Sequence, residues 1–151
     1  MSAADALRVR AALPADAGAV APLLAELGYP IAAAQVRSNL ERLGRGGADR
    51  VLVAVRDGAP LGVLALHVIP LLHDARDVAW ITALVVTERA RGAGVGQALV
   101  AAAEEAARAL GCVRIAVTSA ERRADAHAFY ARLGYAHTGR RFVKALEPPG
   151  A

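Results

Sequence analysis

The sequence of 151 residues is poor in cysteine, lysine and aromatic side chains. Cys112 is its single cysteine, which excludes an internal disulfide and a cysteine-based zinc cluster. Aromatic residues make up 4% of the chain, too few for a surface on which bases stack. No apolar run reaches the roughly 18–20 uncharged residues that cross a bilayer, and no basic stretch precedes an apolar one at the N-terminus. These absences predict a cytoplasmic protein with no membrane partner.

The charge is positive but dispersed. The formal net charge is +4 and the isoelectric point is about 10.0, yet Lys144 is the one lysine among 18 basic residues. The arginines are spread along the chain and form no basic run, so nucleic acid is not expected as a partner. A mild positive field still favours anionic ligands, including a phosphorylated cofactor.

The remaining composition suits one globular unit. Apolar residues make up 56% and charged residues 21% of the chain, which excludes disorder. The length allows one sizeable core, and no repeat or linker interrupts it. We therefore predict a single domain over residues 1–151, with its core at about 7–146.

Hydrophobic periodicity predicts an alternation of strands and helices. Asp57-Gly58 gives the strongest hairpin signal, and Gly28 and Gly134 each end a helix. The order of the elements indicates an α/β (mixed α+β) chain with a mixed sheet and helices on its faces. Strands are predicted at 7–13, 50–56, 61–69, 78–86, 112–118 and 142–146, and helices at 14–28, around Val36, Leu40 and Leu43, at 94–111 and at 125–133.

The most informative stretch is the glycine-rich loop of residues 91–96, between an apolar strand and a long helix. Glycines let the backbone approach a ligand closely, and the helix start presents free N–H groups, so the loop is suited to phosphate. A Walker A loop is excluded because no Gly-Lys-Ser/Thr follows. A dinucleotide fingerprint fails because Gln97 and Leu99 stand where its last glycine is needed. A glycine-rich turn without a ligand is the alternative.

This loop resembles the acyl-CoA-binding motif of the GNAT N-acetyltransferase superfamily. The family pattern Arg/Gln-x-x-Gly-x-Gly/Ala is matched by Arg91, Gly94 and Gly96, shortly after Leu84-Val85-Val86 and before Gln97. A second stretch, Asp125-Ala126-His127-x-Phe129-Tyr130 with Gly134-Tyr135, resembles the downstream motif of the family. Together with residues 141–146 it resembles a subgroup that includes aminoalkylphosphonate N-acetyltransferases.

The resemblance implies a GNAT-type domain with a mostly antiparallel central sheet and acetyl-CoA as cosubstrate. In this family the strand before the loop splays from its neighbour, and the pantetheine arm fills the gap. The main chain at Leu84, Val85 and Val86 would hold that arm, and an N–H near Val86 would polarise the thioester carbonyl. The pyrophosphate would be held by backbone N–H groups of Arg91, Gly92, Ala93, Gly94, Val95, Gly96 and Gln97.

Acetyl transfer to an amine needs a proton donor for the departing thiolate and an acceptor for the amine proton. The resemblance makes Tyr130 the general acid, although it also fits the pattern of a core tyrosine. Many relatives carry a basic glutamate on the strand before the loop, but residues 78–84 contain no carboxylate. The base is therefore a water chain or a side chain such as His67, His73, Asp74 or Asp77, each of which is otherwise a surface residue.

Other polar residues have plainer interpretations. The spacing of His73, Asp74 and Asp77 matches no metal site, so no metal is expected. His127 would pack or cap locally or shuttle a proton, Cys112 would open a strand as a small core residue, and Trp80 would line an acceptor pocket or the core.

The leading hypothesis is an acetyl-CoA-dependent N-acetyltransferase for a small primary amine. The alternatives are a protein Nα- or lysine-acetyltransferase and a non-catalytic acyl-CoA-binding module. The loop at 70–77 would wall the acceptor pocket, and Arg123 and Arg141 are candidates to pair with an acidic group of the acceptor. The apolar strand expected near the C-terminus would permit a homodimer.

Overall fold

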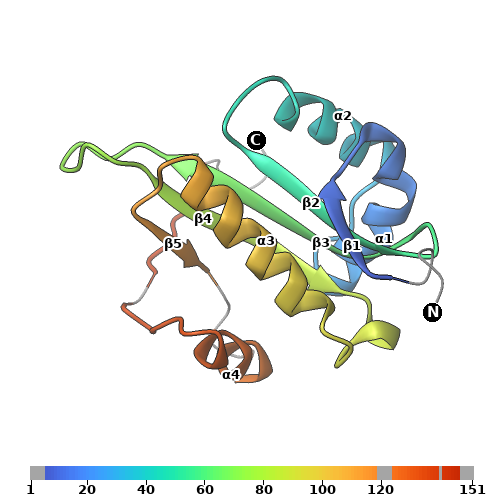
Figure 1. Cartoon of the computed structure of the whole chain (residues 1–151). Helices are drawn as coiled ribbons and strands as arrows, with labels where there is room; N and C mark the ends of the chain where they lie inside the picture. Colours follow the sequence, from blue (N-terminus) through green and yellow to red (C-terminus); the bar gives the residue numbers. More distant parts are fainter. Residues whose placement is uncertain (1–5, 119–123, 140, 147–151) are drawn as a thin grey trace. The chain divides into compact units, whose positions relative to one another are not determined.

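The computed structural model of the chain describes residues 6–118, 124–139 and 141–146 (Figure 1). The chain divides after residue 118 into two compact units, 1–118 and 119–151. Within the described ranges, no helix combines the length and the apolar character needed to span a bilayer. The first unit contains β1 (Arg8–Ala11), η2 (Pro14–Asp16), α1 (Ala17–Leu27), α2 (Ala33–Leu43), β2 (Arg50–Arg56), β3 (Ala59–Ile69), β4 (Val78–Val86), η3 (Glu88–Ala90), α3 (Val95–Ala109) and β5 (Arg114–Val117), and the second contains α4 (Ala124–Arg132).

The five strands form one sheet in the order β1-β2-β3-β4-β5. Neighbours are antiparallel except for β4 and β5, which run parallel. Asp57 and Gly58 connect β2 to β3 with φ angles of 53° and 74°, the left-handed pair that a tight hairpin requires. The predicted fold class, a mixed and mostly antiparallel sheet flanked by helices, is confirmed.

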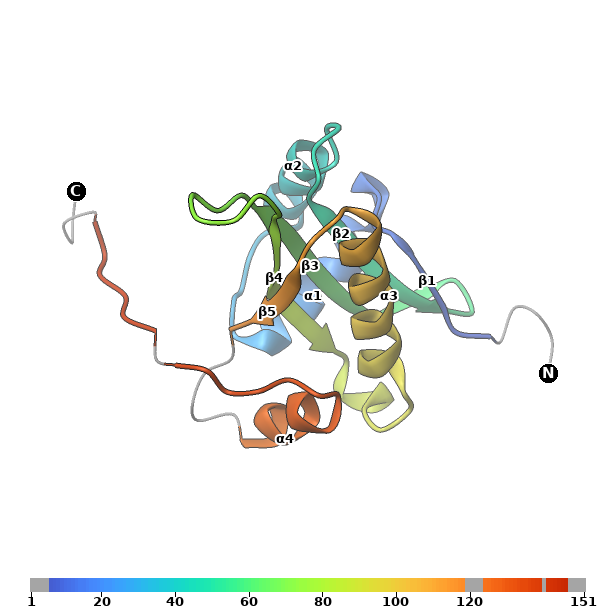
Figure 2. The same cartoon turned by 60° about the vertical axis from the view of Figure 1, so that its left-hand side comes forward.

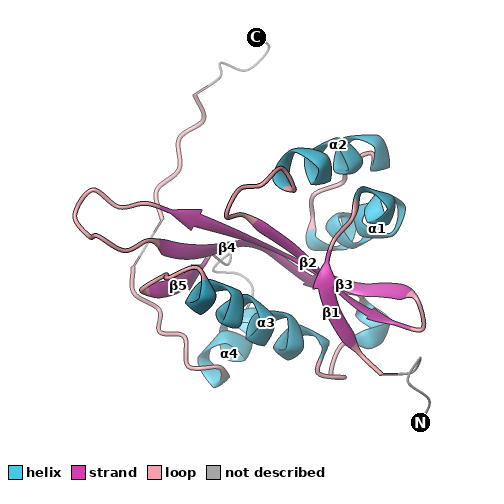
Figure 3. Cartoon of the chain, turned by 45° about the horizontal axis from the view of Figure 1, so that its top comes forward, coloured by secondary structure: helices cyan, strands magenta, loops and turns pink. Residues whose placement is uncertain are grey.

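Helices cover both faces of this sheet. On one face α1 and α2 lie together, and α3 crosses the other (Figure 3). Successive residues of β3 point to opposite faces of the sheet and so contribute to two different cores. Val63 packs in the core formed with α1 and α2, whereas the neighbouring Gly62 faces Leu99 of α3. The α1 and α2 core consists of Ala17, Val20, Ala21, Leu23, Val36, Leu40, Val53, Val63 and Val85.

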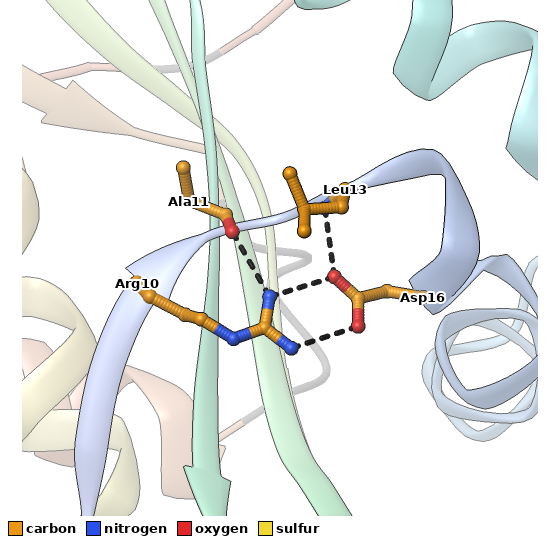
Figure 4. A network of polar contacts seen from close by, with 4 residues as sticks. All are labelled: Arg10, Ala11, Leu13 and Asp16. Carbon is orange, nitrogen blue, oxygen red and sulfur yellow. Dashed lines mark hydrogen bonds and ion pairs between the residues drawn. The ribbon is translucent and has the colours of Figure 1, made fainter.

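A polar network fixes the junction between β1 and α1 (Figure 4). Arg10 donates to both carboxylate oxygens of Asp16, at 2.8 and 2.9 Å, and to the carbonyl of Ala11 at 3.0 Å. The N–H of Leu13 donates to Asp16 Oδ2 at 2.7 Å. The Arg10 hydrogen bonds are the main cause that lowers the pKa of Asp16. The paired, planar contact holds η2 against the end of β1 and so directs α1.

Two strand predictions need correction. Residues 142–146 form no strand, because apolar side chains supply β-propensity but a strand also needs a hydrogen-bonding neighbour. The predicted strand at 112–118 begins only at Arg114. Cys112 is half-buried and lies before it, because its N–H donates to the Ala107 carbonyl at 2.9 Å and so completes the end of α3.

Candidate functional site

The edge of β4 that faces β5 is paired along only part of its length. The parallel register runs from Val78 opposite Arg114 to Ile81 opposite Val117. Beyond that point β5 ends, and residues 82–86 have no strand partner on this side within the described ranges (Figure 2). This open edge is the part of β4 at which the family resemblance places the pantetheine arm.

Along β4, the backbone N–H and C=O groups of successive residues point alternately to β3 and to the open edge. The N–H of Thr87 donates to the Leu61 carbonyl at 2.8 Å, toward β3. Because donors of an antiparallel strand alternate between its two sides, Val85 also faces β3, and Leu84 and Val86 face the open edge. The side chain of Arg91 folds back to this edge and donates through Nε to the Val86 carbonyl at 3.4 Å.

The glycine-rich loop follows β4 and η3. Gly92 and Gly94 have φ angles of 83° and 81°, in the left-handed region that residues with a Cβ rarely adopt. A Cβ on either glycine would meet no atom within 4 Å, so backbone conformation and not crowding accounts for glycine here. Arg91, Gly92, Ala93 and Gly94 are exposed, so an incoming ligand can reach their backbone.

The first turn of α3 presents unpaired donors beside this loop. The N–H of Ala98 is the first to enter the helical ladder, donating to the Gly94 carbonyl at 3.0 Å. The amides of Val95, Gly96 and Gln97 come before that bond and have no acceptor among the described residues. Free amides and the positive end of the helix dipole suit an anionic group.

Two residues that position the loop could not be identified from the sequence. Glu26 of α1 accepts the Glu88 N–H at 3.0 Å and the Thr87 hydroxyl at 3.2 Å, which ties α1 to the end of β4. Gly62 of β3 lets α3 approach closely, because a Cβ there would lie 3.0 Å from Leu99 Cδ1. Neither residue carries a local signal, since both act through partners distant in the chain.

A β-bulge interrupts β4 where the opening begins. Ala65 of β3 lies opposite Ala83 but Leu66 lies opposite Ile81, so Thr82 has no counterpart. The Thr82 hydroxyl is 2.9 Å from His67 Nε2. On the other side of the ring, His67 Nδ1 is 3.4 Å from Asp49 Oδ1. Thr82 and Asp49 were not predicted, because a bulge depends on the register between strands.

The other candidate bases lie in the connection between β3 and β4. His73 is exposed, and Asp74 accepts the Arg76 N–H at 2.9 Å, which is the main cause that lowers the Asp74 pKa and weakens it as a proton acceptor. The Asp77 carbonyl accepts the Val113 N–H at 2.9 Å. Within the described ranges, no group of three or more His, Cys, Asp and Glu residues is placed to hold a metal ion.

Trp80 stands at the same point of the sheet. Its side chain is half-buried and its Nε1 donates to the Thr118 hydroxyl at 2.9 Å. Trp80 lies opposite His67 in the pairing of β3 and β4, so the two side chains share the face covered by α1 and α2. Trp80 thus links β4 to the residue that follows β5.

The second unit holds the predicted acid. Tyr130 is half-buried on α4, with its ring centroid 5.3 Å from Phe129 and 5.8 Å from Tyr135. His127 is exposed and its ring stacks on His137 at 6.3 Å. Arg141 is exposed, and Arg123 lies outside the described residues.

Comparison with known proteins assigns the family. The family model described as "Acetyltransferase (GNAT) family" matches residues 23–135, three quarters of the chain. The chain belongs to the GNAT acetyltransferase family. The matched span of this GNAT chain includes β4, the glycine-rich loop, α3 and α4.

Individual relatives give the same assignment. The chain is 40% identical over 94 residues to the aminoalkylphosphonate N-acetyltransferase of Salmonella typhimurium, which covers 62% of this chain and 61% of that protein. The match thus spans about three fifths of the length of this curated relative. A putative acetyltransferase from Agrobacterium tumefaciens is 25% identical with a TM-score of 0.83, over 91% of this chain and 99% of that chain.

An aminoglycoside N-acetyltransferase solved in complex with CoA shares the fold. Its TM-score is also 0.83, over 93% of this chain and 94% of that chain, at 17% identity. At that identity the similarity shows the fold alone.

Proposed function

We propose that this chain is an acetyl-CoA-dependent N-acetyltransferase that moves the acetyl group directly to the primary amine of a small molecule. The observation that carries the proposal is a row of backbone N–H groups that have no acceptor among the residues that the structure describes. They run from Leu84 and Val86 on the open edge of β4 to the first turn of α3. Such a line of donors matches a ligand with a polar arm that ends in a pyrophosphate.

Each part of this line has a distinct task. The amides of Val95, Gly96 and Gln97, with the loop of residues 91–94, would bind the pyrophosphate of acetyl-CoA. The main chain of Leu84 and Val86 would bind the pantetheine arm as a neighbouring strand would, whereas the main chain of Val85, predicted to share this task, is turned to β3. An N–H of this edge would also donate to the thioester carbonyl, where negative charge develops during transfer.

Two further residues complete the proposed chemistry. Arg91 would exchange its present contact with the Val86 carbonyl for a phosphate oxygen, because guanidinium groups pair well with phosphate. Tyr130 would donate its phenolic proton to the thiolate as the C–S bond breaks. The aromatic rings of Phe129 and Tyr135 restrict the orientation of the Tyr130 ring and so support this assignment.

We propose a small amine that carries an acidic group as the acceptor. The supporting observation is the 40% identity to an aminoalkylphosphonate N-acetyltransferase. Arg141 is exposed and is a candidate partner for the acidic group.

Calorimetry with acetyl-CoA tests the cosubstrate site. Gly94→Val places a β-branched residue at a φ of 81° inside the loop, whereas Gly111→Val does the same at a φ of 79° beyond the other end of α3. Loss of two hydrogen bonds to phosphate, at about 1.5 kcal/mol each, would weaken binding roughly 100-fold in Gly94→Val only. Equal affinity in the two folded variants would contradict the assignment of the loop.

Thiol release with a panel of acceptors tests the reaction. The panel contains aminoalkylphosphonates, polyamines, aminoglycosides, amino acids and short peptides. We expect turnover with small amines, and fastest with those that carry an acidic group. Turnover of peptides alone would favour a protein acetyltransferase, and binding of acetyl-CoA without any turnover would favour a non-catalytic module.

A further inference from the structure

One chain of polar side-chain contacts lies at the opening of β4 and has no role in the function proposed so far. It runs from Asp49, before β2, through His67 of β3 to Thr82 of β4. All three residues come from the first unit, where the pairing of β2, β3 and β4 sets their positions.

The bulge gives Thr82 its unusual position. Thr82 is the residue immediately after Ile81, the last residue of β4 that is paired with β5. It is exposed and has no counterpart on β3, so the bulge directs its side chain independently of the regular alternation. The Thr82 hydroxyl therefore stands next to the point where the pairing of β4 with β5 ends.

Asp49 orients the histidine. Its Oδ1 is 3.4 Å from His67 Nδ1 and also accepts the backbone N–H of Val68 at 3.4 Å. A carboxylate beside Nδ1 favours the tautomer that carries its proton there. The lone pair of Nε2 is then directed at the Thr82 hydroxyl, 2.9 Å away.

We propose that Asp49, His67 and Thr82 form the proton-accepting chain for the acceptor amine, a proposal that rests on the acetyltransferase function above. Thr82 is the group that touches the amine, His67 holds the proton, and Asp49 is a positioning residue. This chain supplies a base on a strand that has no carboxylate between Val78 and Val86. His67 is partly exposed, with 29% of its side chain accessible, so it can release the proton to water.

The distances along β4 fit this role. The Leu84 N–H on the open edge is two residues from Thr82, or about 7 Å at the rise of a strand. A thioester carbonyl held by the Leu84 N–H leaves room for an amine nitrogen between that carbon and the Thr82 hydroxyl. Trp80 lies opposite His67 and two residues before Thr82 on β4, and its indole ring is suited to an ammonium group or an alkyl chain of the amine.

The transfer balances in atoms and charge. The amine nitrogen bonds to the thioester carbonyl carbon, and its surplus proton passes to the Thr82 oxygen while the Thr82 hydroxyl proton passes to His67 Nε2. The C–S bond breaks, its electron pair stays on sulfur, and the thiolate takes a proton from Tyr130. Water then exchanges the proton from His67 and restores the one on Tyr130.

Steady-state kinetics on a set of single variants tests the chain. Thr82→Val and His67→Gln should lower kcat about 100-fold, in the range of general-base catalysis, with acetyl-CoA affinity within twofold of the wild type. Thr82→Ser keeps the hydroxyl and should retain kcat within about threefold. His137→Gln is the matched control, because His137 is an exposed histidine of the second unit outside this chain of contacts, and should leave kcat unchanged.

Added imidazole and NMR give two further readouts. Imidazole should restore part of the lost turnover in His67→Ala and have no effect on His137→Ala. In the protein without cosubstrate, imidazole ¹⁵N shifts should show the Nδ1–H tautomer at His67 in the wild type and a loss of that preference in Asp49→Asn.

Three outcomes would overturn the proposal: wild-type kcat in folded Thr82→Val or His67→Gln, an equal loss in Thr82→Ser and Thr82→Val, or the Nε2–H tautomer at His67 in the wild type. Failure of the proposed function is a different result, namely no acetyl-CoA binding by the wild type. The tautomer measurement does not depend on that binding and decides the orientation of His67 by itself.

Discussion

Tyr130 belongs to an aromatic cluster within the second unit. Phe129 meets its ring edge-to-face at an interplanar angle of 72°, and the N–H of Tyr135 donates to the Tyr130 carbonyl at 3.0 Å. These contacts hold the ring and the backbone of Tyr130. In the proposed role of general acid, a phenol held in this way would avoid the entropy loss of ordering a free side chain.

Removal of this phenol should separate catalysis from binding. We expect Tyr130→Phe to lower kcat by roughly 10²–10⁴-fold and to leave acetyl-CoA affinity unchanged, because only the proton donor is lost. Tyr135→Phe removes a phenol from the same cluster and should keep kcat within about threefold. Full turnover of Tyr130→Phe across pH 6–9 would show that solvent protonates the thiolate.

Asp16 makes the stability of the fold depend on acidity. Its pKa is lowered, chiefly by hydrogen bonds from Arg10, so the ionised carboxylate stabilises the folded state. That contribution is present above the unfolded-state pKa of about 3.9 and is lost as the pH falls through the lower folded-state value. The Asp16 side chain is 11% exposed and the Arg10 side chain is 42% exposed, so solvent screens the pair in part from the arginine side.

Urea unfolding of Asp16→Asn measures this contribution. At pH 7 we expect the free energy of unfolding to fall by about 1–2 kcal/mol, as when a capping side chain is lost, and the difference from wild type to shrink below about pH 4. Glu41→Gln breaks an exposed ion pair with Arg37 at 3.5 Å and should change stability by less than about 0.5 kcal/mol. A constant difference from pH 7 to pH 3 would contradict the linkage.

At the scale of elements, β4 carries most of the proposed chemistry. The sequence predicted its bounds, because residues 78–86 form an apolar run between polar segments. It did not predict the bulge at Thr82, which arises from the register of β4 on β3. The catalytic hypothesis therefore missed Thr82 and Asp49, although His67 was among the candidate bases.

The glycine-rich loop was easier to predict than its supports. Gly92 and Gly94 form a local pattern, and both adopt the left-handed conformation that such a pattern favours. Glu26 is 61 residues away from Thr87 in the chain, and no periodicity indicates that contact. Residues 142–146 show the opposite error, in which a local pattern predicted too much. Their apolar character favoured a strand, but the sequence could not show that they have no strand to pair with.

Close packing between β3 and α3 makes Gly62 a sensitive position. A Cβ there would lie 3.0 Å from Leu99 Cδ1, 3.0 Å from the Val85 carbonyl and 3.2 Å from Val95 Cγ1. We expect Gly62→Ala to lower the free energy of unfolding by about 1–3 kcal/mol, since it overpacks the core. It should also weaken acetyl-CoA binding, because Val95 opens the helix that follows the loop.

Gly18 provides the matched control for this substitution. It lies in α1, where a Cβ would meet no atom within 4 Å. Gly18→Ala should raise the free energy of unfolding by about 0.5–1 kcal/mol through helix propensity. The same sign for both variants in thermal and urea unfolding would contradict the packing argument.

At the scale of the whole molecule, the net charge of +4 acts on every anionic ligand. Arg89 and Arg91 are exposed next to the glycine-rich loop, so part of this charge lies where the pyrophosphate is proposed to bind. A positive field of this kind raises the rate at which a polyanion reaches its site. Salt weakens it, since the screening length falls from about 30 Å at 0.01 M to about 10 Å at 0.1 M.

Two acetyl donors that differ in charge distinguish the effect of the positive field on binding from the rate of acetyl transfer. With acetyl-CoA we expect kcat/KM to fall by up to about tenfold between 0.01 M and 0.1 M NaCl, because steering of a polyanion is lost. S-acetylpantetheine has the same thioester and arm without phosphates, so its kcat/KM should stay nearly constant over that range. Arg89→Gln and Arg91→Gln should each reduce the salt dependence with acetyl-CoA, whereas Arg37→Gln on α2 should not. An equal response of the two donors to salt would show that the positive charge does not guide the cosubstrate.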